Sequence, residues 1–219
     1  MKHEILADGV EIYCGDCREI LKDLPLFDLA VTSPPYNVGI NYANEGSKND
    51  DKPFEEYANF SRDFMNSLKL SDGGRLCLEI GSSGRNFPLS WLWQSSAYNA
   101  GYHLYSEIVL QHRKSNPCAW GSYLKADMVH TIPNFHFLYV FYKDKERKSG
   151  GKTTITEDEW MEWTRGLWHI NFSIGSTKKH PAQFPVELPR RCIRLFGHEG
   201  DSVVDPFMGS GTTALACIR

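Results

Sequence analysis

The feature that most constrains the fold is the alternation of short apolar runs with longer amphipathic stretches along the 219-residue chain. Six of the runs are β-branched or aromatic and are bounded by Gly, Pro or Asp, as strands usually are. They are Val10–Cys14, Leu29–Thr32, Arg75–Ile80, Leu104–Gln111, Phe135–Tyr142 and Ser202–Asp205. Strands that alternate with helices indicate an α/β layered fold, and the length fits one domain.

Two amphipathic stretches predict helices. Apolar side chains recur at spacings of three and four over Glu55–Leu70, and Asp72-Gly73-Gly74 is the expected stop. The same spacing recurs around Cys192, where Gly197 is the expected left-handed end and Pro189 leaves the first turn open. The apolar residues of these two faces are Tyr57, Phe60, Phe64 and Leu68, then Leu188, Cys192, Leu195 and Phe196.

A third, shorter helix is expected after a capping box. Thr156 and Glu159 have the spacing at which each side chain satisfies the other's backbone N–H. Trp160, Trp163 and Leu167 then fall along one face, and the tryptophans are expected to pack against the body of the protein.

Composition excludes some classes and leaves others open. No apolar window is long enough to span a membrane, and Met1–Gly9 lacks the apolar core of a secretory signal. The six cysteines are scattered, which favours reduced thiols in a cytoplasmic protein over a disulfide framework. The net charge of −3 decides little about nucleic acid, because one basic face can hold a phosphate backbone.

Lys143–Lys152 is the most basic segment and ends in glycines, so it is expected to be a mobile surface loop. Two interpretations stay open: a solvated loop without a partner, or a contact to a phosphate backbone through Lys145, Arg147 and Lys148.

A glycine-rich turn follows the last predicted strand. Asp205 to Thr213 reads DPFMGSGTT, and a helix is expected to begin directly after the glycines. Glycines let the backbone approach a ligand closely, and free N–H groups at a helix start attract a carboxylate or phosphate. Without Gly-Lys-Ser/Thr a P-loop is excluded. The dinucleotide pattern G-x-G-x-x-A is also met at Gly209, Gly211 and Ala214, but its acidic residue would lie beyond Arg219.

A second unusual turn, Thr32-Ser33-Pro34-Pro35-Tyr36-Asn37, follows the strand Leu29–Thr32. Open α/β sheets bind ligands at the carboxyl ends of their strands, so this turn is placed where a ligand would bind. Two prolines stiffen it, and Tyr36 offers a flat aromatic face. A Pro-Pro turn with a purely structural role is the alternative.

Together the two turns resemble the circularly permuted class, often called β, of DNA amino-methyltransferases. In that family a Ser/Asp-Pro-Pro-Tyr catalytic motif comes first and the S-adenosylmethionine motif comes last, as Ser33–Tyr36 and Asp205–Thr213 do here. Three further segments are similar to the family: Tyr13–Cys17, Ala119–Ser122 and His180–Pro185. The resemblance implies a Rossmann-like fold with a mostly parallel sheet, helices on both faces, and S-adenosyl-L-methionine as cofactor.

The resemblance also assigns site residues. The catalytic ones are Ser33, Pro34, Pro35 and Tyr36; the cofactor-binding ones are Asp16, Cys17, His180, Pro181, Ala182, Asp205, Pro206, Phe207, Gly209, Ser210, Gly211, Thr212 and Thr213. Asp16 would approach the adenine, and the turn from His180 would close over the methionine end. No metal is implied, because the methyl donor is a sulfonium, and Cys14-x-x-Cys17 without a second pair is expected to be a strand-to-helix turn rather than a zinc site.

The chemistry explains these residue types. The lone pair of an exocyclic amino nitrogen is delocalised into the base, and acceptors at its two protons favour a tetrahedral, reactive geometry. The Ser33 side chain and the Pro34 carbonyl are the expected acceptors. Tyr36 would stack on a base flipped out of duplex DNA, and such stacking returns roughly 1 to 3 kcal/mol of the extrusion cost. Ser33 and the Phe184-Pro185 ending favour cytosine N4 over adenine N6 as the target.

Three expectations concern the rest of the molecule. The single domain, 1–219, contains a small inserted candidate target-recognition region at about 143–176, with Asn41–Lys52 as a second loop near the base pocket. The chain is expected to be truncated after the cofactor motif, because family members continue to a strand that holds the ribose. A modification enzyme with a partner endonuclease is expected, and a homodimer or a separate specificity chain would supply further base contacts.

Two other functions remain as alternatives. A DNA-binding module that has lost catalysis would bind DNA without methyl transfer. A nicotinamide-dependent oxidoreductase would use the turn Gly209–Ala214 but would leave Ser33–Tyr36 unexplained.

Overall fold

The computed structural model describes residues 2–6, 9–40, 50–81, 87–112, 120–121, 124–127, 129–130, 133–171 and 184–218. Its centre is a six-stranded sheet with the order β10-β3-β4-β8-β5-β9. The strands are β3 (Phe27–Thr32), β4 (Leu70–Gly81), β5 (His103–His112), β8 (Phe135–Tyr142), β9 (Leu167–Ile170) and β10 (Val203–Val204). Strand β8 runs antiparallel to both of its neighbours, while the other pairs are parallel. The sheet is therefore mostly parallel, as expected.

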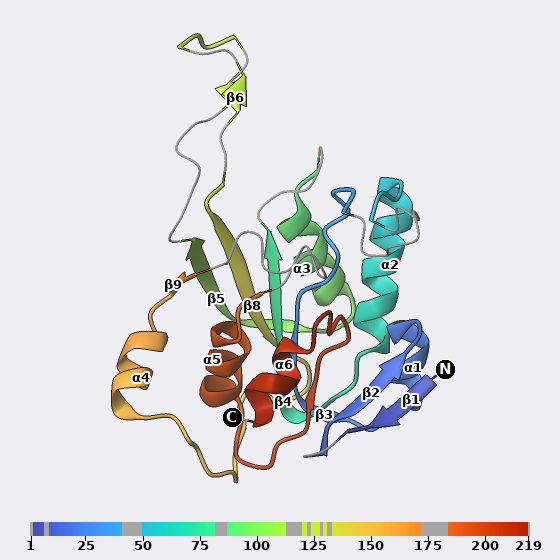
Figure 1. Cartoon of the computed structure of the whole chain (residues 1–219), viewed down its shortest axis with the longest axis vertical. Coiled ribbons are helices and arrows are strands. Elements are labelled where there is room, and N and C mark those ends of the chain that lie inside the picture. Colours follow the sequence, from blue (N-terminus) through green and yellow to red (C-terminus); the bar gives the residue numbers. More distant parts are fainter. Residues whose placement is uncertain are drawn as a thin grey trace.

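Helices cover both faces of this sheet (Figure 1). One face carries α1 (Cys17–Asp23), α2 (Phe54–Ser67) and α3 (Leu89–Asn99); the other carries α4 (Glu157–Trp163), α5 (Glu187–Phe196) and α6 (Thr212–Ile218). A hairpin of β1 (Lys2–Ile5) and β2 (Glu11–Cys14) lies beside α1, and β6 (Trp120–Gly121) pairs with β7 (Val129–His130) apart from the main sheet. This is the α/β layered architecture that the alternation of elements predicted, in the Rossmann-like form that the resemblance implied.

The period of two along the strands divides the core between the faces. Ala30 of β3 packs with α1, α2 and α3, whereas its neighbours Leu29 and Val31 pack with α5. In β8, Tyr139 belongs to the first cluster and Leu138 to the second. Leu29–Thr32 of β3, Leu76–Ile80 of β4 and Leu138–Phe141 of β8 are buried on both faces of the sheet and almost continuously apolar, which made these strands recognisable.

All six predicted strands are present, with bounds that differ by a few residues. The helix expected over Glu55–Leu70 is shorter and ends at Ser67, so its predicted end was wrong. Leu68 is already extended, and Leu70 pairs with Phe27 as the first residue of β4. Asp72-Gly73-Gly74 therefore lies inside a strand, where Gly73 has φ +76°. Strand pairing overrode the helical pattern here.

Gly197 does follow the last residue of α5, but its φ of −109° shows that the expected left-handed end was wrong. Pro189 is the third residue of α5, where a missing N–H costs nothing.

The capping box of α4 is present, with both Thr156 and Glu159 bonded as predicted. Trp163 and Trp168 are buried, whereas Trp160 is half exposed, so only part of the expected tryptophan packing is found. Leu167 does not continue the helical face but opens β9, because α4 ends at Trp163 and the chain turns into the sheet.

The sequence patterns of α3 and β1 do not predict these elements. The exposed face of α3 carries Trp91 and Tyr98, so the helix has little contrast between apolar and polar sides. Strand β1 is exposed along its whole length and shows no alternation.

No helix in the part of the chain described above is long and apolar enough to cross a membrane. The five described cysteines are all free.

Candidate active site

The ends of four neighbouring strands bring the two sequence motifs together. Strands β10, β3 and β4 are parallel, so their carboxyl ends share one edge of the sheet, and the antiparallel β8 begins at that same edge. A cavity of about 1430 Å³ lies there. Ser33–Tyr36 and Asp205–Gly209 both line it, although they stand some 170 residues apart in the chain. The sheet order, rather than the sequence, makes them one site.

The turn after β3 is held from two sides. Pro34 is buried, and the Tyr57 hydroxyl of α2 donates to the Pro35 carbonyl at 2.6 Å. The Tyr36 ring lies against Gly81 at the end of β4: a Cβ at Gly81 would come within 3.0 Å of Tyr36 Cε2. Only a residue without a side chain leaves room for the ring in this position.

A buried carboxylate organises the backbone that follows this turn. Asp50, 2% exposed, accepts hydrogen bonds from the backbone N–H groups of Asn37 (2.6 Å), Val38 (3.1 Å) and Ile40 (3.1 Å). Asn37 has φ +57°, and its side chain exchanges two hydrogen bonds with the backbone of Lys52. These bonds tie both ends of the predicted loop Asn41–Lys52 to the site; residues 41–49 lie outside the described part.

Glu79 and His136 form an ion pair in the cavity wall. Glu79 is 3% exposed near the end of β4, and its Oε1 lies 2.5 Å from Nδ1 of His136 on β8. Glu79 Oε2 accepts from the Tyr36 hydroxyl at 2.8 Å. Burial alone would raise the pKa of Glu79, but the charge of His136 and these hydrogen bonds hold it below its usual value. Burial opposes the charge on His136, whose pKa Glu79 nonetheless raises.

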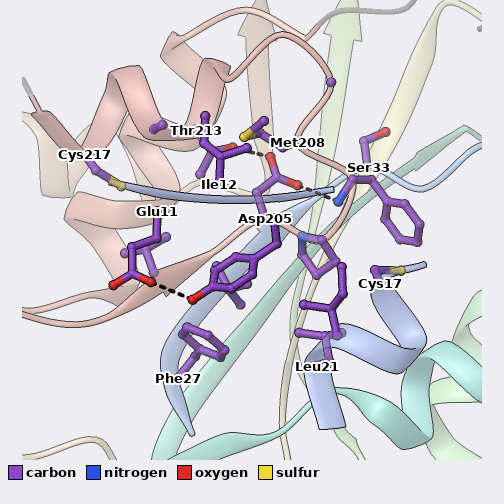
Figure 2. A pocket seen from close by; sticks show the side chains of 18 of the residues that line it. Glu11, Ile12, Cys17, Leu21, Phe27, Ser33, Asp205, Met208, Thr213 and Cys217 are labelled. Carbon is purple, nitrogen blue, oxygen red and sulfur yellow. Dashed lines mark hydrogen bonds between the residues drawn. The ribbon is translucent and has the colours of Figure 1, made fainter. Parts of the chain in front are cut away.

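The glycine-rich turn is built around Asp205. Its Oδ1 accepts from Thr32 Oγ1 at 2.7 Å and from the backbone N–H of Phe207 at 3.1 Å, and its Oδ2 accepts from Thr213 Oγ1 at 2.6 Å. Figure 2 shows the carboxylate between Thr213 and the turn. The carboxylate thus links β3, the turn and α6. Burial raises the pKa of Asp205, although the three donors oppose that shift.

The remaining walls of the cavity come from β2, α1 and the end of the chain. Tyr13, whose hydroxyl donates to Glu11 at 2.5 Å, and Phe27 line the cavity. Cys17 and Cys217 lie on opposite sides of it (Figure 2). The volume exceeds the roughly 300 to 1,000 Å³ of ordinary ligand pockets. It therefore has room for a cofactor and a second molecule side by side.

Six of the thirteen expected cofactor residues are gathered here. Cys17, Asp205, Pro206, Phe207, Gly209 and Thr213 line the cavity. Ser210, Gly211 and Thr212 lie in the same turn but are not among the residues that line it. His180, Pro181 and Ala182 are outside the described residues.

Asp16 does not line the cavity either. Its carboxylate caps α1 through the Arg18 N–H at 2.9 Å and pairs with the Arg18 guanidinium at 2.6 Å, and these contacts hold its pKa below the usual value. The turn Cys14–Cys17 joins β2 to α1, as predicted.

The basic loop lies at the other edge of the sheet. It follows the end of β8, beside the start of β4: Lys145 pairs with Asp72, and Lys148 pairs with Asp201 at 2.7 Å. Arg75, 4% exposed, donates to carbonyls of Gly73 and of the loop. Two of the three predicted DNA-binding cations are thus engaged within the protein, and the structure does not bring the loop to the turn Ser33–Tyr36.

Residues 143–171, the described part of the expected target-recognition region, are built into the main domain. Strand β9 pairs with β5, and α4 contacts α5. Between these two helices the Glu159 carboxylate forms ion pairs with Arg190 at 2.7 Å and with Arg194 at 2.5 Å. A role of this region in DNA recognition stays a prediction.

Three site residues had not been singled out from the sequence: Asp50, Glu79 and His136. Glu79 interrupts the apolar run of β4, and a charged residue in a buried strand is a signal that could have been used. His136 likewise interrupts the apolar run of β8, whereas Asp50 carries no such signal, because only the fold places it against the turn Ser33–Tyr36.

The comparison with protein families agrees with this geometry. The N6_N4_Mtase family model, described as DNA methylase, matches residues 27–219. The chain belongs to this family of DNA methylases. S-adenosyl-L-methionine is the cofactor, and the cavity fits it: the volume is sufficient, and the left-handed Gly209 (φ +55°) and Gly211 (φ +81°) keep side chains off the turn. Within the described residues no three His, Cys, Asp or Glu side chains gather as a metal site would require.

Individual relatives of this DNA methylase cover most of its length. The type II methyltransferase M.MjaVI of Methanocaldococcus jannaschii is 36% identical over 181 residues, 78% of this chain and 89% of M.MjaVI. M.ScaI of Streptomyces caespitosus, also a type II methyltransferase, is 30% identical over 95% of this chain and 73% of its own. TTHA0409 of Thermus thermophilus, described as a DNA modification methylase and solved with S-adenosyl-L-methionine, has a TM-score of 0.66 and 27% identity over 92% of this chain and 82% of its own.

Proposed function

We propose that this DNA methylase transfers a methyl group to the exocyclic amino group of a base flipped out of duplex DNA, and that cytosine N4 is favoured over adenine N6. The observation that carries the proposal is the single cavity lined by both Ser33–Tyr36 and Asp205–Gly209. When bound, S-adenosyl-L-methionine supplies an electrophilic methyl group on a sulfonium. The protein's task is then to align the amino nitrogen with that group, and orientation is where such a site gains most.

The catalytic turn has the groups that this alignment needs. The Ser33 side chain and the Pro34 carbonyl are the proposed acceptors for the two amino protons. The next carbonyl, that of Pro35, accepts a hydrogen bond from the Tyr57 hydroxyl. This bond fixes the orientation of the preceding peptide group, which carries the Pro34 carbonyl. The Tyr36 ring lines the cavity and is the proposed stacking surface for the base.

The preference for cytosine rests on Ser33 and on the Phe184-Pro185 ending, which resemble those of cytosine-N4 enzymes. Phe184 lines the same cavity as Ser33, so it is close enough to shape the pocket. The permuted order of the family is supported by the sheet: β10, which precedes the cofactor turn, is last in the chain but lies next to β3, which precedes the catalytic turn.

We further propose that the enzyme is the modification member of a restriction-modification system, with an endonuclease that recognises the same site. The type II names of M.MjaVI and M.ScaI support this assignment. Base contacts beyond the cavity are then expected from the part of residues 143–176 that follows the basic loop 143–152, or from a second copy of the chain.

The test is transfer of radiolabelled methyl from S-adenosyl-L-methionine to duplex DNA, followed by mass spectrometry of the nucleosides. We expect N4-methylcytosine, and Ser33→Ala should abolish transfer while leaving cofactor affinity within about twofold. N6-methyladenine would overturn the choice of base. DNA binding without transfer by the unmutated chain would overturn the enzyme assignment in favour of a binding module.

A further inference from the structure

Asp50, a buried residue, accepts hydrogen bonds from four successive backbone N–H groups that follow Tyr36. Three of them donate to its carboxylate, and the fourth donates to its backbone carbonyl at 2.6 Å. The four donors are, in chain order, Asn37, Val38, Gly39 and Ile40. A carboxylate that is only 2% exposed is costly unless it is hydrogen-bonded, and backbone amides meet that condition here. Asp50 is not among the residues that line the cavity, so its effect on the site must pass through the chain that it holds.

Asn37 turns the chain at this point. Its φ of +57° lies in the left-handed region, which asparagine adopts more readily than most residues. Its side chain accepts from the Lys52 N–H at 2.6 Å and donates to the Lys52 carbonyl at 2.8 Å. The turn after Tyr36 is thereby fixed against the segment that leads into α2.

The peptide groups on both sides of Tyr36 are held by hydrogen bonds. The Asn37 N–H, bound by Asp50, belongs to the peptide group that follows Tyr36. The Pro35 carbonyl, bound by Tyr57, belongs to the peptide group that precedes it. Because a peptide group is planar, one such bond sets the orientation of the whole group. With both groups held, the φ and ψ angles of Tyr36 are fixed, and with them the direction in which its side chain leaves the backbone.

The ring of Tyr36 is held as well. Its hydroxyl donates to Glu79 at 2.8 Å, and the ring lies against Gly81. Ile40, the last of the four donors to Asp50, lines the same cavity as this ring. An aromatic surface for stacking needs a defined plane, because small displacements of a reacting base cost much of the rate.

We propose that Asp50 is a positioning residue for methyl transfer, which acts through the backbone on Tyr36 and Ile40 and so sets the surfaces that receive the flipped base. This inference rests on the proposed function of the site. It assigns Asp50 no contact with the base or with the cofactor.

The experiment is single-turnover and steady-state methyl transfer to duplex DNA by Asp50→Asn. The amide has nearly the same shape, but one acceptor oxygen becomes an N–H donor, which meets a backbone N–H whichever way the amide turns. We expect kcat to fall about 100-fold. The KM for DNA and the affinity for S-adenosyl-L-methionine should stay within about threefold, because the aromatic ring and the cofactor turn are both retained.

A double variant tests whether Asp50 acts through the ring of Tyr36. Gly81→Ala displaces the same ring from its other side. Combined with Asp50→Asn, it should slow transfer by less than the product of the two separate effects, because both changes disturb one ring position.

Asn37→Gly tests the same turn should Asp50→Asn fail to fold. Glycine adopts a φ of +57° without strain and keeps the N–H that Asp50 binds, but it loses both side-chain bonds to Lys52. We expect about tenfold slower transfer.

Asp28→Asn is the matched control. Asp28 is the second residue of β3, and its carboxylate accepts from the Ser202 N–H at 3.0 Å and from the Ser71 hydroxyl at 2.6 Å. The same chemical change there should lower Tm but keep kcat, because Tyr36 follows the opposite end of this strand.

Three results would overturn the assignment to Asp50. They are an unchanged kcat in Asp50→Asn and Asn37→Gly, rate losses of Asp50→Asn and Gly81→Ala that multiply in full, and a loss of kcat in Asp28→Asn equal to that in Asp50→Asn. Absence of methyl transfer by the unmutated chain is a different result, which refutes the proposed function itself.

Discussion

Replacement of Asp205 separates two roles that its position allows, contact with the cofactor and support of the turn that surrounds it. Asp205→Ala removes the acceptor from the hydroxyls of Thr32 and Thr213, which are 1% and 3% exposed, and from the Phe207 N–H. A buried polar group left unsatisfied costs about 1 to 3 kcal/mol, so the two hydroxyls predict a loss of about 2 to 6 kcal/mol in the free energy of unfolding. For a chain of this size that lowers Tm by roughly 4 to 24 °C.

Asp205→Asn is the matched control for charge. The amide keeps one acceptor, and the Thr213 hydroxyl can turn to accept from its N–H, so a smaller loss of stability is expected. Because burial raises the pKa of Asp205 in the folded protein, its contribution to stability is fully present below the unfolded pKa and declines as pH rises through the folded one. The asparagine variant lacks this decline. Its stability relative to the unmutated protein should improve as the pH rises above about 4.

The assay is thermal unfolding without cofactor, together with calorimetric titration of S-adenosyl-L-methionine. We expect Asp205→Ala to lose both Tm and cofactor affinity, because the turn itself loosens. An alanine variant with unchanged Tm and lost affinity would refute this reasoning, since the carboxylate would then act on the cofactor rather than on the turn.

Three further perturbations test other parts of the structure. Gly81→Ala should slow methyl transfer at least about tenfold in a single-turnover assay, because the new Cβ would lie 3.0 Å from the Tyr36 ring; an unchanged rate would show that the ring position is not critical. Two arginines of α5 help to lower the pKa of Glu159 to about 2, so this residue should contribute stability at neutral pH that is lost as pH falls from its usual pKa towards 2. Glu159→Gln should flatten this part of the curve of Tm against pH. A steep curve in that variant would contradict the pairing. Neutralising Lys145 and Arg147 should leave the salt dependence of DNA binding unchanged, since their loop lies away from the turn Ser33–Tyr36. A weaker dependence of DNA affinity on salt in that variant would show that the loop does contact DNA.

Local patterns were sufficient for much of this molecule. Strands β3, β4 and β8 are buried on both faces and read as apolar runs, so they were found, whereas β9 of the central sheet was missed. The capping box at Thr156 specified the start of α4. Each of these signals depends on a few adjacent residues and on one rule of secondary structure. Where a distant partner decided the outcome, as when β3 drew Leu70 into β4, the local pattern failed.

The candidate site divides in the same way. Ser33–Tyr36 and the turn from Asp205 are contiguous motifs, and their residue types suit a base and a cofactor whatever surrounds them. Their union in one cavity required the order β10-β3-β4, in which the last strand of the chain lies beside the third. Glu79 and His136 needed the antiparallel pairing of β8 with β4 as well.

The sequence by itself therefore determined the class of fold and the residue types of the two turns, because strand burial, prolines and glycines act over a few residues. Only the tertiary structure decided which side chains support that chemistry. A carboxylate 43 residues from Tyr36 and a histidine 100 residues from it meet at one strand edge, and nothing in the spacing of the chain encodes that meeting. Such contacts arise from strand order, which is settled by the packing of the whole domain.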